Sequence, residues 1–204
     1  MKNKNKDFTA ELGFTYQTGI NFPERTIYLF GGIDIEVARN FMIGFNTLDK
    51  SGEWIRIILN SPGGDEGAGF CIYETIKYSN SPVLIDGYGV VFSMASMIMQ
   101  AGTVRRMTPE CRFMVHCGSV GLSTDVETST FVALGNELSY IHQRYKDILS
   151  EKSKKTKDEV GKLCDKESYI SAQEAADWGF IDSIIATGND LEVSIKKRKP
   201  KKAK

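Results

Sequence analysis

Ser93 and His116 are the two residues of this chain whose types and positions could supply a nucleophile and its base. Ser93 follows an extended run and a glycine-containing turn and opens a predicted helix, so its hydroxyl would lie near the Met94 N–H and the helix dipole. His116 ends a strand-like run, where an imidazole would be held rigidly. A serine nucleophile needs a base, an acid that orients the base, and N–H donors for the oxyanion. Acyl transfer is therefore one interpretation; a helix N-cap and a core histidine are the more common roles of such residues.

The remaining residues with chemical potential fit ordinary roles. His142 adjoins Gln143 and Arg144 on a predicted long helix, so we expect it to be a solvated surface residue. The glycine-rich turns at 60–64 and 87–89 are too short for a phosphate-binding loop, which makes nucleotide binding a weak hypothesis. The four cysteines show neither a CxxC pair nor a histidine at metal spacing, which predicts free thiols in a reducing compartment and no structural metal (Cys71, Cys111, Cys117 and Cys164).

Composition and length predict one soluble globular domain. The chain has 204 residues, of which 41% are hydrophobic and 25% charged. No stretch approaches the roughly 18 consecutive apolar residues that a membrane span requires. Met1–Asp7 is rich in lysine and asparagine with no apolar run behind it, unlike a secretory signal. We therefore expect a cytoplasmic protein that binds no membrane. The serine chemistry considered above would need no metal or organic cofactor.

The basic residues of the C-terminal segment offset a net negative charge on the rest of the chain. Lysine and arginine total 26 and balance 26 acidic residues, but seven of the basic residues fall in 196–204. The rest of the chain therefore has 19 basic against 26 acidic residues, a net charge of −7. Like charges repel and bury nothing, so we expect a disordered tail at 191–204. An acidic body argues against nucleic-acid binding by the folded domain.

Strand-like and helical runs alternate along the chain. The patterns predict strands at 26–30, 54–59, 83–85 and 113–116, and helices at 35–48, 68–76 and 93–100. Ser171 and Glu174 match a capping box that opens another short helix, which Gly179 closes. The alternation predicts βαβ units around a mostly parallel sheet, that is, an α/β fold.

The longest predicted helix runs from about Thr124 to Lys152. Its apolar residues are spaced by 3 and 4 in alternation, a period of 3.5 that is typical of a helix against a partner helix (Phe131, Leu134, Leu138, Ile141, Tyr145 and Ile148). Packing on the core of the same subunit would explain the stripe equally well. Such a helix would extend roughly 40 Å, so we expect part of it to reach another subunit.

From about Glu24 to Ile185, about four-fifths of the chain, the sequence resembles the proteolytic subunit of the Clp protease. Five pieces in the family's order carry the resemblance: Glu24–Phe30, Leu59–Gly64, Ser93-Met94 with Ala101-Gly102, Arg112–His116, and Ser171–Ala175 with Trp178–Asp182. No single piece is decisive, but five in order at near-family spacing are specific. The resemblance implies a ClpP/crotonase-like fold of repeated ββα units with a protruding handle helix, formed by residues 23–190.

The resemblance also assigns roles to individual residues. Ser93 matches the nucleophile and His116 the general base, while Gly64 and Met94 match the N–H donors of the oxyanion hole. The position of the family's catalytic aspartate holds Glu167, and Asp165 is the alternative acid. Two neighbours could compete with these residues. Ser96 falls one helical turn after Ser93 and out of register, and Cys117 would point to the opposite strand face from His116.

Assembly and partners follow from the same resemblance. It implies homo-oligomeric rings, heptamers stacked as a tetradecamer, that admit peptides or unfolded proteins delivered by an AAA+ unfoldase. Three departures from the family's pattern leave the ring assembly and the unfoldase partner open. Residues 1–22 do not match the family's axial loops, Cys117-Gly118 replaces the usual Gln-Pro, and segment 118–123, where rings would join, is short. A phage-encoded or accessory paralogue would explain the divergence.

Two alternatives to an active serine endopeptidase stay open from the sequence. One is a catalytically weak structural or regulatory subunit of a mixed ring, which Glu167 and the altered 118–123 segment motivate. The other is acyl-CoA chemistry of the crotonase type on the same broad fold, where an oxyanion hole stabilises an enolate. That chemistry does not call for a serine–histidine pair in this arrangement.

Overall fold

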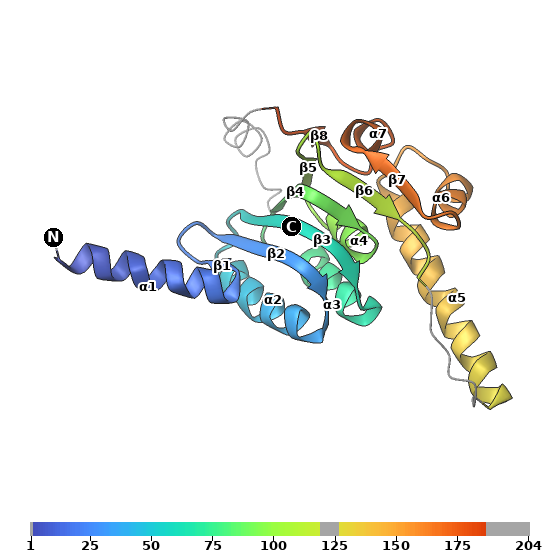
Figure 1. The fold of residues 1–204 in the computed structure, drawn as a ribbon, viewed down its shortest axis with the longest axis horizontal. Helices are drawn as coiled ribbons and strands as arrows, with labels where there is room; N and C mark the ends of the chain where they lie inside the picture. The colour runs from blue at the N-terminus through green and yellow to red at the C-terminus, as the bar shows by residue number, and fades with distance from the viewer. Residues whose placement is uncertain (1, 119–126, 187–204) are drawn as a thin grey trace.

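The computed structural model describes residues 2–118 and 127–186, with side chains from residue 9 onward. In this part of the chain eight strands form one sheet, whose main path runs β1-β2-β3-β4-β5-β8 (Figure 1). The strands are β1 (Ile20–Asn21), β2 (Thr26–Ile33), β3 (Ile55–Gly64), β4 (Val83–Phe92), β5 (Val104–Met107), β6 (Arg112–Val115), β7 (Ser168–Ser171) and β8 (Ser183–Ile184). The tail expected at 191–204 and most of segment 118–123 lie outside the described residues.

The sheet is mostly parallel, as the alternating pattern predicts. All pairs from β2 through β5 to β8 are parallel, and so is the pair of β4 with β6. Only β1–β2 and β6–β7 are antiparallel in the described residues. Because β4 pairs with both β5 and β6, the sheet forks beyond its middle strand, and β6 and β7 form a separate wing (Figure 1).

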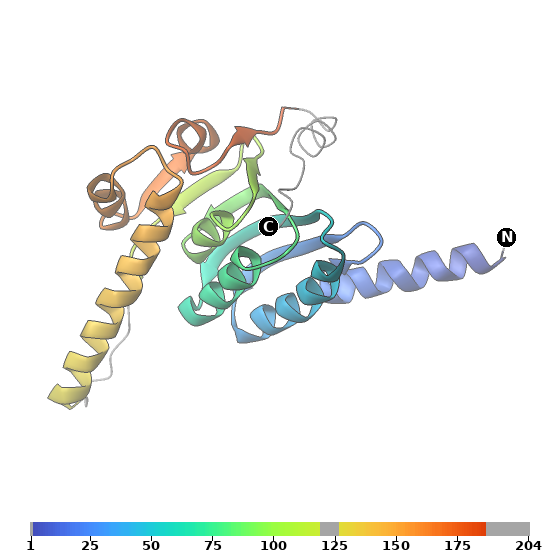
Figure 2. The same ribbon diagram turned by 180° about the vertical axis from the view of Figure 1, so that it is seen from behind.

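Helices flank this sheet. They are α1 (Lys2–Thr18), α2 (Ile35–Leu48), α3 (Glu66–Lys77), α4 (Met94–Met99), α5 (Thr128–Glu151), α6 (Lys157–Cys164) and α7 (Ala172–Asp177), with a 3-10 turn at Asp49–Ser51. α2, α3 and α4 lie side by side on one side of the central strands, while α1 and α5 project away from the body in different directions (Figures 1 and 2). The mixed α/β architecture expected from the sequence is confirmed.

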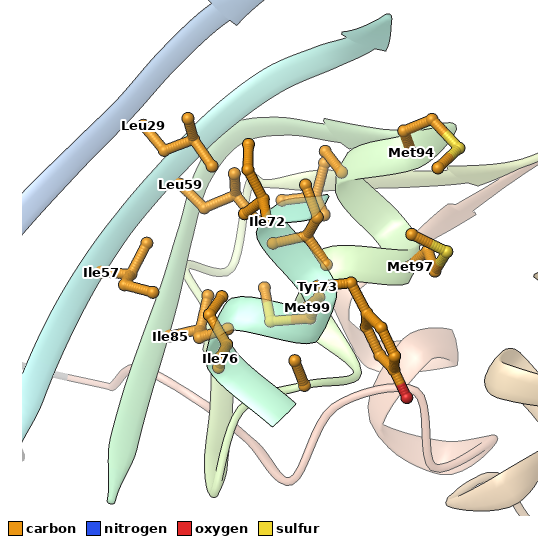
Figure 3. Close-up of a cluster of buried hydrophobic side chains, with 14 of the residues drawn as sticks. Leu29, Ile57, Leu59, Ile72, Tyr73, Ile76, Ile85, Met94, Met97 and Met99 are labelled. Atoms are coloured by element: carbon orange, nitrogen blue, oxygen red, sulfur yellow. The ribbon is translucent and has the colours of Figure 1, made fainter. Parts of the chain in front are cut away.

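The core lies between the central strands and the helices that cover them. Figure 3 shows Leu29, Ile57, Leu59 and Ile85 of the strands beside Ile72 and Ile76 of α3 and Met97 and Met99 of α4. In β3, Ile55, Ile57 and Leu59 on one face are buried, and on the other face Ile58 is buried and Arg56 half-buried. That pattern explains why residues 54–59 read as a continuous apolar run.

Two predicted turns are strand segments in the structure. Residues 60–64 belong to β3, and 87–89 belong to β4. The pairing register shifts between Leu59, which faces Gly87, and Ser61, which faces Val91. A bulge accommodates these glycines without ending the strands, so the prediction of turns was wrong although the local irregularity is real.

Helix boundaries follow capping residues. Asp34 caps α2 by accepting from the Val37 N–H, and the Ser171–Glu174 capping box opens α7 as predicted. A second capping box, Thr156 with Glu159, opens α6. Helix α6 is not among the elements predicted from the sequence, although its signal is present there. Helix α1 and strand β5 were not predicted either.

The long helix is shorter in the described residues than expected. α5 begins at Thr128, after the Glu127 N-cap, and ends at Glu151. The predicted start near residue 124 falls outside the described residues. Tyr145 and Leu149 are buried against the body, whereas Phe131, Val132 and Tyr140, nearer the N-terminal end, are exposed. Among the described residues, the buried side chains of α5 therefore lie in its C-terminal half.

A buried ionic group ties the three middle strands together. Asp86 of β4 is fully buried; its carboxylate accepts from Arg106 Nε of β5 at 2.7 Å and from Arg56 Nε of β3 at 2.8 Å. Arg106 is itself 1% exposed, so the facing carboxylate stabilises its positive charge in place of water. One carboxylate thus pairs with guanidinium groups from both neighbouring strands.

We predict that Asp86→Asn destabilises the fold strongly. The change removes the negative charge opposite a buried guanidinium, which typically costs about 3–5 kcal/mol in the free energy of unfolding. Urea titration followed by circular dichroism measures this loss. As a matched control, Glu36→Gln removes an exposed carboxylate paired with Arg39, and should shift the same free energy by about 0.5 kcal/mol or less. Equal effects of the two variants would contradict the prediction.

Candidate active site

Ser93 occupies a strained turn between β4 and α4. Its φ of 54° and ψ of −123° place a non-glycine residue where L-amino acids rarely lie, at a cost of about 1–3 kcal/mol. The Ser93 N–H donates to the Met114 carbonyl of β6 at 2.9 Å, which fixes the turn to the forked wing of the sheet. A sharp strand-to-helix turn of this kind exposes a serine hydroxyl at the end of a sheet.

His116 lies beside this serine. It comes just after β6, and its Nε2 is 2.8 Å from Ser93 Oγ. Both side chains are half-buried. That distance is within hydrogen-bond reach for a base that removes the hydroxyl proton. The structure therefore brings together the two residues that the sequence singled out.

A cleft of about 630 Å³ opens beside the pair. Ser93 and His116 share its wall with Gly64 and Met94, the two candidate oxyanion donors. Gly64 has a φ of 155°, and a Cβ there would approach the Ile33 carbonyl oxygen to 2.1 Å, so the close approach of β3 to β2 requires glycine at this position. The neighbouring Gly63 backs directly onto Ser93, whose Cβ would be 2.7 Å from a Cβ at Gly63.

Glu167 and Asp165, the candidate acids, line a second cavity of about 510 Å³ together with His116. Glu167 has a φ of 50°, and its Oε1 accepts from the Tyr169 hydroxyl at 2.6 Å, a bond that raises the pKa of Tyr169. Asp165 Oδ1 is paired with Lys146 Nζ at 2.8 Å. Within the described residues, neither carboxylate is hydrogen-bonded to the imidazole. Both acids are therefore near the base without orienting it in this conformation.

Ser96 and Cys117, which are close in sequence to Ser93 and His116, lie in different surroundings. Ser96 Oγ is buried and bonded to the Ser93 carbonyl, so it faces the core. Cys117 lies on the wall of the second cavity with His116. β6 ends at Val115, so the strand alternation that was expected to separate these two side chains does not extend to them. Burial raises the pKa of the Cys117 thiol, which keeps it protonated and a poor nucleophile.

His142 is not the solvated surface residue that the sequence suggested. It is half-buried in the wall of the first cleft, and its buried Nε2 makes no hydrogen bond to any described residue. The reason is that α5 lies over the cleft, so the helix face with Ile141 and Tyr145 also brings His142 toward it. The apolar stripe that passes through Ile141 and Tyr145 was the available signal.

Three further findings bear on the chemistry of the described residues. Their side chains hold no group of three histidine, cysteine or acidic residues positioned for a metal ion. Their helices include none long and apolar enough to cross a bilayer. The four cysteines are free thiols, and burial raises the pKa of Cys111 and Cys164 to about 12.

Comparison with known proteins finds relatives that are proteolytic subunits of Clp proteases. The chain is 28% identical to ATP-dependent Clp protease proteolytic subunit 1 of Corynebacterium jeikeium over 172 residues, which cover 82% of this chain and 90% of the relative. It is 30% identical to ATP-dependent Clp protease proteolytic subunit 3 of Rhizobium etli over 192 residues, 91% of this chain and 96% of the relative. The family description of the Clp protease matches residues 15–188. The chain belongs to the Clp protease family.

Proposed function

We propose that this chain is the proteolytic subunit of a Clp-type protease and acts as a serine endopeptidase on peptides and unfolded proteins. The observation that carries the proposal is the 2.8 Å hydrogen bond between Ser93 Oγ and His116 Nε2 at the wall of the cleft. Membership of the Clp protease family supports the same reaction. ATP would be used by a partner unfoldase and not by this chain.

The reaction would proceed through an acyl-enzyme. His116 Nε2 takes the Ser93 proton as Oγ attacks the peptide carbonyl, and the N–H groups of Gly64 and Met94 stabilise the oxyanion. The C–N bond then breaks, and the imidazolium gives its proton to the leaving amine. Water, activated by the same imidazole, hydrolyses the ester and restores Ser93. Losing one oxyanion donor typically costs about 3–4 kcal/mol of transition-state stabilisation.

Glu167 is the better of the two candidate acids. Its carboxylate has an oxygen, Oε2, that accepts no hydrogen bond from the described residues, and the hydroxyl of Tyr169 holds the other oxygen. The charge of Asp165 is offset by its pairing with Lys146. An unneutralised carboxylate stabilises an imidazolium more strongly than one that already faces a cation. We infer that Glu167 reaches His116 when the active conformation forms.

We expect Ser93→Ala to abolish peptide cleavage and covalent labelling by a fluorophosphonate without preventing assembly. The probe phosphonylates an activated serine oxygen, so intact mass should show one adduct per wild-type chain and none in the variant. Ser183→Ala removes an exposed hydroxyl on β8 and should label like wild type. Full activity in Ser93→Ala would refute the assignment.

We expect Glu167→Gln to lower kcat/KM roughly 10³-fold or more, because a neutral amide neither stabilises the imidazolium nor secures its tautomer. Asp165→Asn is the matched variant and should remain within about threefold of wild type, since Asp165 already faces Lys146. Steady-state kinetics with a fluorogenic peptide measures both. The reverse ranking would make Asp165 the acid.

Ring assembly is proposed from the resemblance and from α5. The exposed apolar side chains Phe131, Val132 and Tyr140 leave the stretch of this helix from 131 to 140 without a covering partner in its own subunit, among the described residues. Covering them with a second copy would remove apolar surface from water.

Native mass spectrometry should therefore give a heptamer or tetradecamer, and Phe131→Asp should shift the population toward smaller species by placing a charge in that contact. Lys50→Asp, which also introduces an acid at an exposed site, is the control away from α5. A monomeric wild type would contradict the ring proposal.

A catalytically weak subunit of a mixed ring is the second candidate. The observation that favours it is the missing carboxylate–imidazole hydrogen bond in the described residues, with Glu167 bonded to Tyr169 and Asp165 to Lys146. The fluorophosphonate experiment separates the two candidates. An assembled wild-type ring that does not label would favour the weak subunit, whereas stoichiometric labelling at Ser93 excludes it.

A further inference from the structure

The carbonyl of Ser93 is held by a buried cluster of two hydroxyl groups. It accepts from Ser96 Oγ at 2.6 Å and from the Tyr145 hydroxyl at 3.2 Å, in addition to the Ser96 N–H at 2.9 Å. The two hydroxyl oxygens are 2.7 Å apart. Ser96 is 0% exposed and Tyr145 4% exposed. The cluster is therefore a buried support of the nucleophile turn.

The protons of this cluster can be counted. Two hydroxyl protons serve three oxygen–oxygen contacts, so one proton points to the Ser93 carbonyl and the other lies between the hydroxyls. Either hydroxyl can take the position next to the carbonyl, and both are satisfied in each arrangement. Loss of either hydroxyl leaves the carbonyl with one side-chain donor, and that donor loses the neighbouring hydroxyl that orients it, which weakens the hold on the carbonyl.

The Tyr145 hydroxyl acts as a proton donor in this cluster. Burial raises its pKa, and the hydrogen bond with Ser96 acts in the opposite direction on the same oxygen. The phenol thus stays protonated as a donor toward the Ser93 carbonyl. One oxygen from α5 thereby contacts the main chain of the Ser93 turn.

The strain at Ser93 makes this contact consequential. A non-glycine residue at a φ of 54° persists only where its surroundings determine its conformation. The Ser93 N–H is fixed by Met114, and the other end of the residue, its carbonyl, is fixed by the hydroxyl cluster. Without the cluster the turn can relax, and a small rotation there moves Oγ relative to Nε2.

We propose that Tyr145, acting with Ser96, is a positioning residue that holds Ser93 in reactive geometry toward His116 through the Ser93 main-chain carbonyl. α5 contributes the residue, so the seating of this helix on the body governs the nucleophile. The inference rests on the proposed serine peptidase function. Filling of the core by the tyrosine ring is a separate role, which the phenylalanine variant preserves.

The test is Tyr145→Phe in the full-length assembled protein. We expect the rate constant for fluorophosphonate labelling of Ser93, and kcat for a fluorogenic peptide, to fall about 5–20-fold, the size of effect that loss of one neutral hydrogen bond produces. KM should stay within about twofold, because the ring that lines the cleft is retained. Native mass and thermal unfolding confirm that both proteins compared are folded and assembled.

Tyr73→Phe is the matched control. Tyr73 is a buried tyrosine of α3, and Figure 3 shows its hydroxyl pointing away from the labelled core residues. The variant loses the hydroxyl of another largely buried tyrosine, 6% exposed against 4% for Tyr145, that does not touch the nucleophile turn, so labelling and kcat should match wild type. A general loss of stability would slow both tyrosine variants alike and would overturn the positioning role.

Ser96→Ala tests the same cluster without altering α5. We expect a similar fall in kcat, and the double variant with Tyr145→Phe should fall further than either single variant, because it removes both side-chain donors to the Ser93 carbonyl. Wild-type labelling rates in both single variants would overturn the inference and leave the proposed function intact. Absence of Ser93 labelling in the wild type would instead refute the proposed function, and this inference with it.

Discussion

The turn at Ser93 is the constraint on which the rest of the site depends. It lies where β3, β4 and β6 meet: Gly63 backs onto the serine, Met114 accepts its N–H, and the hydroxyl cluster holds its carbonyl. A side chain at Gly63 would collide with this turn, so the close approach needs glycine. The fork of the sheet places His116 at the same point, because β6 leaves the β4 edge there. Strain at one residue is thus sustained by contacts from several elements.

The two acidic residues near His116 line the second cavity, whereas Ser93 lines the first cleft. Glu167 accepts a hydrogen bond from the Tyr169 hydroxyl, and Asp165 is paired with the Lys146 ammonium group. The two carboxylates therefore differ in how strongly their charge could stabilise an imidazolium, although they are only two residues apart in the sequence. This difference is the basis for proposing Glu167 and not Asp165 as the orienting acid, and residue type alone does not carry it.

Much of the fold could be predicted from local patterns. Helix α2, the buried strand β3 and the capping box of α7 follow from apolar spacing and capping residues, which are local properties. The glycines at 63 and 89 were taken for turns, because a glycine permits a positive φ equally in a turn and in a bulge. Pairing with the neighbouring strand decides between the two. The burial of His142 likewise depends on where α5 crosses the cleft.

The sequence by itself determined the class of fold, the family resemblance and the identity of the serine–histidine pair, since these depend on residue types and their order. Tertiary structure decided the 2.8 Å contact between Ser93 and His116, 23 residues apart, and the distinct partners of Glu167 and Asp165. It also brought Tyr145 beneath the nucleophile from a helix 52 residues away. Contacts over such separations depend on how strands and helices pack, and a periodic pattern records only that a residue is buried, not which atoms it meets.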